Sequence, residues 1–235
     1  MKVSAETSGE IGVLDLQGGV LEHLDHLRRI GLCGRPVRDV GDFAGLAGLI
    51  IPGGESTCLS RLLRIFHLDR CILDAYEGGT KLWGTCAGAI LLAKENVGET
   101  PHLGLIDITV HRNAFGSQLD SFRCTALVPR VAAEPLPLTF IRAPKITRVG
   151  PGVEVLLEMD GYVAAAETER IFVTVFHPEL TPGLAFHRYF ARKCGLAVAD
   201  TSGPQAVDPD WNRQSWMRAG RRGECGPGAN AGNGD

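Results

Sequence analysis

The sequence lacks long apolar runs and a large excess of charge of either sign. No stretch approaches the roughly 18 apolar residues that a membrane-spanning helix needs. The first residues, Met1–Glu6, lack the apolar core of a signal peptide. A formal net charge of −3 gives no general attraction to nucleic acid or to an anionic membrane. We therefore expect a cytoplasmic protein that binds neither.

The sequence also lacks motifs for metals and nucleotides. Its seven cysteines are dispersed without a C-x-x-C pair, and this odd number favours free thiols over disulfides or a zinc site. The chain has no G-x-x-x-x-G-K-[ST] and no G-x-G-x-x-G stretch, which weakens the case for nucleotide binding. The sequence thus predicts neither a metal nor a cofactor.

The 235 residues are 44% hydrophobic, enough for one substantial core. Strands are predicted near 11–16, 49–51, 81–83 and 171–176, and helical patterns alternate with them. This alternation is typical of an α/β fold with a mostly parallel sheet and helices on both faces. The apolar face of the first helix is predicted to consist of Leu21, Leu24, Leu27 and Ile30, with Gly31 ending the helix.

The middle of the chain, from about 103 to 163, is richer in β-branched residues and proline, and it predicts mixed or antiparallel strands. A closing helix is expected over 184–192, capped by Gly195. We expect one domain over residues 10–198, after an N-terminal extension over residues 1–9. The composition of residues 199–235, rich in Gly, Pro, Asn and Arg, predicts a disordered tail.

One cysteine lies between two glycines in the stretch Lys81–Leu92, where an apolar strand gives way to a helix. A nucleophile at the tip of such an elbow needs small neighbours, which Gly84 and Gly88 supply. The N-terminus of a helix that begins near Ala87 favours a reactive thiolate. Cys86 is therefore the candidate nucleophile, and a buried structural cysteine beside a tight turn is the alternative.

A candidate base follows the strand predicted at 171–176. His177 lies where that strand ends, which is the edge where open α/β sheets carry their chemistry. Glu179 lies two residues on, and Pro178 stiffens the turn between them. A histidine that takes the thiol proton and a carboxylate that orients it complete a triad with Cys86. A plain turn is the alternative for these residues taken alone.

A glycine pair, Gly53 and Gly54, follows the strand predicted at 49–51. Acyl transfer at a carbonyl creates an oxyanion. Backbone N–H groups of a glycine-rich loop stabilise that charge together with the N–H of the residue after the nucleophile, here Ala87. A phosphate-binding loop or a simple turn is the alternative, and the lack of a nucleotide-binding glycine motif weakens the first of these. The helical pattern after the loop is carried by Leu59, Leu62, Leu63 and Phe66.

Three motifs in this order resemble the class I (triad) glutamine amidotransferases: Pro-Gly-Gly-Glu-Ser at 52–56, Gly-Thr-Cys-Ala-Gly at 84–88 and His-Pro-Glu at 177–179. Further stretches look like the glutaminase subunits of pyridoxal 5′-phosphate synthase. They are Leu-Gln-Gly-Gly-Val at 16–20, the run 107–116 that contains Arg-Asn-Ala-Phe-Gly, and Phe-Ile-Arg-Ala-Pro at 140–144. The resemblance spans roughly residues 10 to 195, and it implies a flavodoxin-like fold.

The resemblance also implies a reaction. Glutamine is hydrolysed to glutamate and ammonia through a γ-glutamyl thioester on Cys86. His177 deprotonates the thiol and later activates water, and Glu179 holds His177. Gly54 and Ala87 offer the oxyanion donors.

Matching to the family's motifs implies a glutamine site as well. Free glutamine carries an α-carboxylate and an α-ammonium, so its pocket needs a forked cation and an acceptor. Glu55 is a possible acceptor, and without the motifs each arginine would be interpreted as a solvated surface charge. The implied residues are Gly53, Gly54, Glu55, Arg112, Ile141 and Arg142.

A partner is implied because ammonia released into neutral water is protonated and lost as a nucleophile. The family's partner is the pyridoxal 5′-phosphate synthase subunit, a (β/α)₈ barrel that combines ammonia with a pentose phosphate and a triose phosphate. The family's glutaminase is poorly active alone. Our hypothesis is that Gly53 and Gly54 reorient on docking to form the oxyanion hole.

Three alternatives stay open at this point. A glutaminase that serves imidazole glycerol phosphate synthesis is disfavoured by the Arg-Asn-Ala-Phe-Gly stretch at 112–116. A cysteine hydrolase or chaperone-like protein of the flavodoxin-like superfamily is not expected to have His-x-Glu. A catalytically silent docking module would be expected to have lost a triad residue. The sequence also departs from the family pattern at Asp15, which must either point outward at the strand's end or have a partner.

Overall fold

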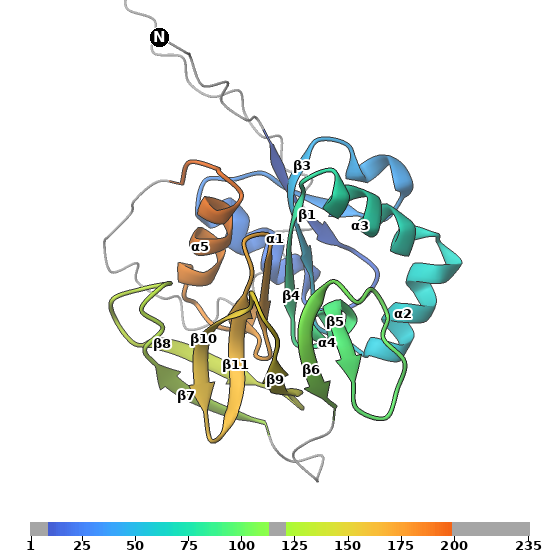
Figure 1. Ribbon diagram of the computed structural model, residues 1–235. Coiled ribbons are helices and arrows are strands. Elements are labelled where there is room, and N and C mark those ends of the chain that lie inside the picture. Colours follow the sequence, from blue (N-terminus) through green and yellow to red (C-terminus); the bar gives the residue numbers. More distant parts are fainter. Residues whose placement is uncertain (1–8, 113–120, 199–235) are drawn as a thin grey trace, which may run out of the picture.

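A ten-stranded sheet forms the centre of the computed structural model, which describes residues 9–112 and 121–198 (Figure 1). The strand order is β2-β1-β3-β4-β12-β11-β9-β6-β5, and β10 pairs with β11. The first five strands of this order all pair in parallel. They are β1 (Glu10–Leu14), β2 (Gly34–Val37), β3 (Leu46–Ile51), β4 (Lys81–Thr85) and β12 (Ile171–Thr174).

The middle of the chain supplies the antiparallel part of the sheet, as expected. Here β11 pairs antiparallel with β9, β10 and β12, and β9 pairs antiparallel with β6, whereas β5 and β6 pair in parallel. A separate hairpin of β7 and β8 lies beside it (Figure 1). The bounds are β5 (Ala93–Asn96), β6 (Ile106–His111), β7 (Phe122–Ala126), β8 (Leu136–Phe140), β9 (Lys145–Val149), β10 (Glu154–Met159) and β11 (Tyr162–Glu167).

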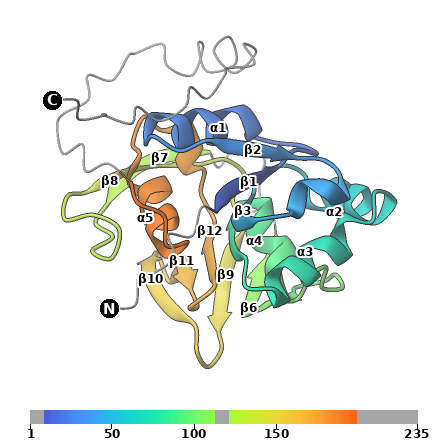
Figure 2. The same cartoon turned by 90° about the horizontal axis from the view of Figure 1, so that it is seen from above.

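Helices cover both faces of the parallel strands (Figures 1 and 2). On one face lie α1 (Val20–Arg29) and α5 (Ala185–Lys193), and on the other lie α2 (Ser56–Ile65), α3 (Leu68–Glu77) and α4 (Ala87–Leu92). The fully buried Trp83 of β4 faces α1 and α5, with its ring centroid 5.5 Å from that of His23 and 4.9 Å from that of His187. No helix in residues 9–112 and 121–198 is long and apolar enough to cross a membrane.

The predicted first helix exists, but one residue of its apolar face was wrong. Leu27 and Ile30 are buried as expected, whereas Leu21 is exposed. The buried positions of α1 instead include His23 and His26. A prediction from hydrophobicity favours leucine at an inward position. Here hydrogen bonds to other elements allow two imidazoles to be buried instead.

The structure also tests the expectations for Asp15 and for the cysteines. The first strand ends at Leu14, and Asp15 has a partner just beyond it, since Arg38 Nε lies 2.7 Å from its carboxylate. The free-thiol prediction is confirmed for Cys58, Cys71, Cys86, Cys124 and Cys194. It is wrong for Cys33, which is disulfide-bonded, because spacing along a chain does not report which sulfurs meet in space.

Candidate active site

Cys86 lies in the turn between β4 and α4, with φ 49° and ψ −106°. Positive φ is unfavourable for any residue with a side chain, so this cysteine is held in a strained conformation. Its N–H donates to the carbonyl of Thr174 in the neighbouring strand at 2.8 Å, which helps to fix the turn. The cysteine is 6% exposed, and α4 begins at the next residue, Ala87.

The glycines on either side of Cys86 allow this turn. A methyl group on Gly84 would lie 2.5 Å from the backbone carbon of Gly88, and one on Gly88 would lie 2.1 Å from the carbonyl oxygen of Ile51. Each distance is far below van der Waals contact, so neither position accepts a larger residue without movement of the backbone. The predicted elbow, with two required glycines, is therefore present.

His177 lies between Cys86 and Glu179. Its ring lies close enough to the side chain of Cys86 for the two to interact, and its Nδ1 lies 2.8 Å from Oε1 of Glu179. The Glu179 carboxylate is almost fully buried, on the short helix η2 (Pro178–Leu180). Because a carboxylate only accepts hydrogen bonds, Nδ1 of His177 carries the proton that it donates to Glu179. This leaves Nε2 as the ring nitrogen for exchange with a thiol or a leaving group.

The surroundings of His177 favour its charged form. Burial lowers its pKa, but the hydrogen bonds and charges of Cys86 and Glu179 outweigh burial and raise that pKa from 6.5 to about 10. At neutral pH the ring is therefore an imidazolium, and its Nδ1 donates to Glu179. In Glu179, burial opposes ionisation, but His23 and His177 together lower the pKa of its carboxyl below the ordinary value.

A cavity of about 500 Å³ opens above Cys86 and His177. The size is within the range of small-molecule sites. Every candidate residue from the sequence lines it: Gly53, Gly54, Glu55, Cys86, Ala87, Arg112, Ile141, Arg142, His177 and Glu179. Gly54 has φ 153°, so a side chain there would be strained. The adjacent stretch Asn113–Gly116, which carried part of the family resemblance, lies outside the described residues.

Glu55 and Arg112 form an ion pair at the rim of the cavity. Nη2 of Arg112 lies 2.8 Å from Oε1 of Glu55, and Nη1 lies 3.0 Å from Oε2 of Glu99. Glu55 also caps α2, accepting from the N–H groups of Thr57 and Cys58. The hydroxyl of Thr57 also donates to the Glu55 carboxylate. These hydrogen bonds, chiefly that from the hydroxyl, lower the pKa of Glu55 to about 2. Glu55 is thus anionic, and Arg112 is already engaged by two carboxylates.

Arg142 differs from Arg112 in having no ion-pair partner within residues 9–112 and 121–198. It lies in the loop between β8 and β9, with a positive φ of 45°, and it is exposed beside Ile141. A guanidinium at the rim of a cavity, with no carboxylate of the described chain bound to it, is free to bind an anionic ligand.

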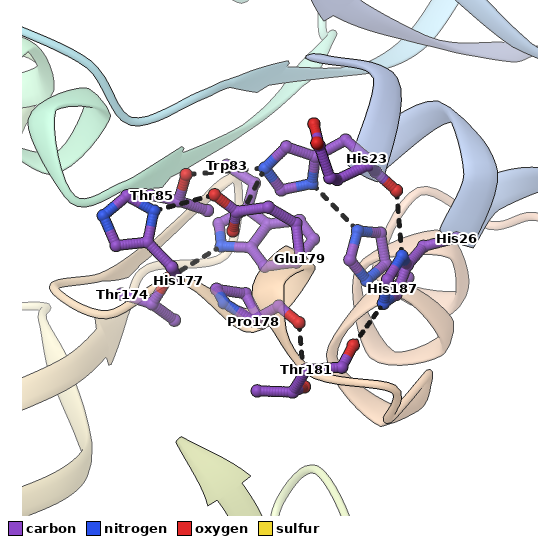
Figure 3. Close-up of polar contacts among 11 residues, drawn as sticks. His23, His26, Trp83, Thr85, Thr174, His177, Pro178, Glu179, Thr181 and His187 are labelled. Atoms are coloured by element: carbon purple, nitrogen blue, oxygen red, sulfur yellow. Dashed lines mark hydrogen bonds and ion pairs between the residues drawn. The ribbon is translucent and has the colours of Figure 1, made fainter. Parts of the chain in front are cut away.

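The sequence reasoning assigned no role to two residues near this site. Gln17 lines the cavity, and its Oε1 accepts the N–H of Glu55 at 3.1 Å. It belongs to the Leu-Gln-Gly-Gly-Val stretch already noted, so the signal was present without a function attached. His23 lies behind Glu179, with its Nε2 3.5 Å from Oε2 of that carboxylate (Figure 3). No local pattern distinguishes it from an ordinary helix residue.

The chain is similar in sequence to known proteins. A pyridoxal 5′-phosphate synthase subunit PdxT from Syntrophus aciditrophicus is 61% identical over 208 residues, covering 88% of this chain and 93% of the relative. One from Clostridium acetobutylicum is 46% identical over 186 residues, covering 77% of this chain and 98% of the relative.

Solved structures support the fold. A crystal structure described as a glutamine amidotransferase superposes with a TM-score of 0.75 at 41% identity, covering 80% of this chain and all of the other. A structure of PurLQS from Thermotoga maritima superposes with a TM-score of 0.57 at 14% identity, covering 78% of this chain and 98% of the other, and so supports the fold alone. The predicted α/β class I glutamine amidotransferase fold is confirmed. Residues 13–196 match the model of the SNO glutamine amidotransferase family, and the chain belongs to that family.

Proposed function

We propose that this chain is the glutaminase subunit of a pyridoxal 5′-phosphate synthase, and that Cys86, His177 and Glu179 carry out its reaction. The observation that carries the assignment of these residues is that His177 lies between Cys86 and Glu179, with all three residues lining the same cavity. The names of the related proteins support the choice of synthase.

In the first step, the sulfur of Cys86 attacks the side-chain carbonyl carbon of glutamine as a thiolate. The imidazolium of His177 then donates its Nε2 proton to the leaving amide nitrogen, so that ammonia departs and a γ-glutamyl thioester remains. Glu179 stabilises the imidazolium and holds its ring in place through Nδ1.

In the second step, the now neutral His177 takes a proton from water through Nε2. The hydroxide adds to the thioester carbon, the carbon–sulfur bond breaks, and glutamate is released with Cys86 again a thiolate beside the imidazolium. In both steps the carbonyl oxygen becomes negatively charged. Gly54 and Ala87, which line the cavity together with Cys86, are the proposed backbone donors to it.

The charges at the rim indicate how glutamine is oriented. Arg142 is the better match for the α-carboxylate, because Arg112 is bound to Glu55 and Glu99. Glu55 is anionic and suits the α-ammonium. In this proposal Arg112 holds Glu55 in position, while Gly53, Gly54 and Ile141 shape the wall around the aliphatic part of the substrate.

The proposed partner is the (β/α)₈-barrel subunit of the same synthase, which uses the ammonia to make pyridoxal 5′-phosphate. We propose residues 10–198 as the glutamine amidotransferase domain, since the family match covers 13–196. We also propose a cytoplasmic location. The glutaminase of imidazole glycerol phosphate synthesis is disfavoured, since the related proteins named above belong to pyridoxal 5′-phosphate synthase.

The experiment is glutamate release from glutamine by the purified chain, with and without a pyridoxal 5′-phosphate synthase barrel subunit. We expect release that the barrel subunit stimulates, that Cys86→Ala abolishes and that Cys71→Ala leaves unchanged. Cys71 is a free thiol on α3, away from the cavity, and serves as the matched control. Binding of the barrel subunit without glutamate release in either condition would instead support a silent docking module.

A further inference from the structure

Behind the triad, three histidines from two helices form a buried cluster. His23 and His26 come from α1 and His187 from α5, and none of the three is exposed to solvent (Figure 3). Burying imidazoles is costly unless they are hydrogen-bonded. His26 meets this need locally and across the fold, since its ring nitrogens lie 2.8 Å from the carbonyl oxygen of Glu22 and 2.9 Å from that of Thr181. His23 and His187 are connected differently.

His23 links the cluster to the triad. Its Nε2 lies 3.5 Å from Oε2 of Glu179, and its Nδ1 lies 2.9 Å from Nε2 of His187. Oε2 of Glu179 is buried and has no hydrogen-bond partner within residues 9–112 and 121–198. Oε1 of the same carboxylate is used by His177. His23 thus supplies the ring nitrogen that faces the second oxygen of the triad carboxylate.

The positions of the protons follow from what each atom can satisfy. Nδ1 of His187 is buried without a partner in the described chain, and a buried lone pair without a donor is better tolerated than a buried N–H without an acceptor. The proton of neutral His187 is therefore on Nε2, from which it donates to Nδ1 of His23. That leaves the proton of His23 on Nε2, directed at Glu179.

We propose that His23 is a positioning residue for the glutaminase reaction: its Nε2–H, fixed by His187, holds the Glu179 carboxylate so that Glu179 orients His177. This inference rests on the proposed function. It extends the triad by two residues: His187 donates to His23, and His23 directs its N–H at Glu179, which orients His177 beside Cys86. Because burial keeps the pKa values of His23 and His187 below 6.5, both rings stay neutral at neutral pH and carry no second proton that would change the direction.

Other charged groups near this series are few. His26 and His177 are the titratable groups near His23 besides Glu179, and His26, His23 and Arg29 are those near His187. The hydroxyl of Thr85 lies 3.5 Å from Nε2 of His23 and is not titratable. A change at His23 therefore acts on the triad through Glu179.

Two substitutions of His23 separate a positioning role from mere packing. The amide nitrogen of glutamine occupies the place of Nε2 of histidine, whereas that of asparagine occupies the place of Nδ1. His23→Gln therefore retains a donor toward Glu179, and His23→Asn loses it while both remove the ring. His26→Gln is the control for general disturbance of the cluster, since His26 is equally buried but bonds to carbonyl groups.

The readout is the pH dependence of kcat and kcat/KM for glutamate release in the complex with the barrel subunit. We expect His23→Asn to lower kcat at least 10-fold, to leave KM within 3-fold, and to move the acidic limb of the profile upward by about one pH unit. For His23→Gln we expect kcat to stay within 3-fold of the wild-type value. Its acidic limb should stay within a few tenths of a pH unit. Equal behaviour of the two variants, or an unmoved acidic limb in His23→Asn, would overturn the proposal.

A second measurement needs no variant that could fail to fold. Nitrogen-15 NMR of wild-type protein labelled at histidine identifies which ring nitrogen of each neutral histidine carries the proton. We expect Nε2–H for both His23 and His187. Nδ1–H on His23 would overturn the inference, because that form presents a lone pair to Glu179. This result is independent of catalysis, so it separates failure of the inference from failure of the glutaminase assignment, which the Cys86→Ala assay tests.

Discussion

Gly53 and His177 are so close that a methyl group on Gly53 would lie 2.4 Å from Cε1 of the imidazole. The same methyl group would lie 3.3 Å from the β-carbon of Cys86. Gly53 thus closes one side of the space in which the nucleophile and its base meet. Its lack of a side chain is a requirement of the site rather than of a turn.

Gly53→Ala should therefore displace His177 from Cys86 and Glu179. We expect a loss of at least 100-fold in kcat for glutamate release, because a shift of about 1 Å in a reacting group costs this much. Gly41→Ala is the matched control, since a methyl group there meets nothing within 4 Å. Retention of wild-type kcat in Gly53→Ala would show that His177 does not need its present position.

The strained turn at Cys86 predicts a difference between two inactive variants. Cys86→Ala retains a side chain at φ 49°, whereas Cys86→Gly removes it and is free to adopt that angle. We expect Cys86→Gly to be more stable than Cys86→Ala by about 1 kcal/mol, from urea unfolding. At an unstrained position a glycine variant is ordinarily less stable than the alanine variant. A Cys86→Ala variant more stable than Cys86→Gly would therefore contradict the strain at Cys86.

The buried histidines predict loss of stability in acid. Burial, partly offset by Glu179, lowers the pKa of His23 from 6.5 to about 4, and burial lowers that of His187 well below 6.5. Below pH 6.5 the unfolded chain binds protons that the folded chain does not, so stability falls with pH until His23 titrates near 4. The effect of His177 on stability has the opposite sign, because its pKa is raised in the folded chain. Its contribution to stability is complete below pH 6.5 and is lost only as the pH rises through about 10.

Between pH 6.5 and 4.5, His23 alone should lower the free energy of unfolding by about 2 kcal/mol. Urea unfolding at the two pH values checks this loss. His187→Phe, which removes one buried imidazole among aromatic neighbours, should reduce the loss by about 1 kcal/mol or more. A stability that is constant over this range would mean that the cluster is protonated in the folded protein.

The two rim arginines predict different kinetic effects. Arg142→Ala removes the proposed partner of the substrate α-carboxylate, and we expect KM to rise about 10- to 100-fold with kcat within about 3-fold. Arg112→Ala is expected to free Glu55 and to change both constants, because its contacts are with Glu55 and Glu99. Arg70→Ala, on α3, is the control. An unchanged KM in Arg142→Ala would remove it from the glutamine site.

The parts of this site that a sequence can predict are those determined by neighbours along the chain. Gly84, Cys86 and Gly88 lie within five residues, and the elbow they form follows from local sterics. The pair His177 and Glu179 is equally local. The alternation of strands and helices also predicted a mostly parallel sheet, although it did not predict the order of the strands in that sheet.

The parts that the sequence did not predict depend on contacts between distant segments. His23 and Glu179 meet only because α1 and η2 pack behind β4, and the error at Leu21 came from giving an inward position to a leucine rather than to a histidine. The ion pairs of Arg112 with Glu55 and Glu99 also join distant segments, and the motif that placed Arg112 at the cavity gave no sign of them. Burial is predicted from the spacing of hydrophobic residues. Polar residues that are buried because they are hydrogen-bonded do not contribute to that spacing, so it does not predict their burial.

The most direct test of the account uses a glutamine analogue with a diazoketone in place of the amide, 6-diazo-5-oxo-L-norleucine. A nucleophile that attacks the side-chain carbonyl of bound glutamine is alkylated by this compound and stays labelled. Incubation with the complex, followed by peptide mapping, should show label on Cys86 alone, with activity lost in parallel and glutamine protecting. Loss of activity with Cys86 unlabelled, or with label on another residue, would contradict Cys86 as the nucleophile.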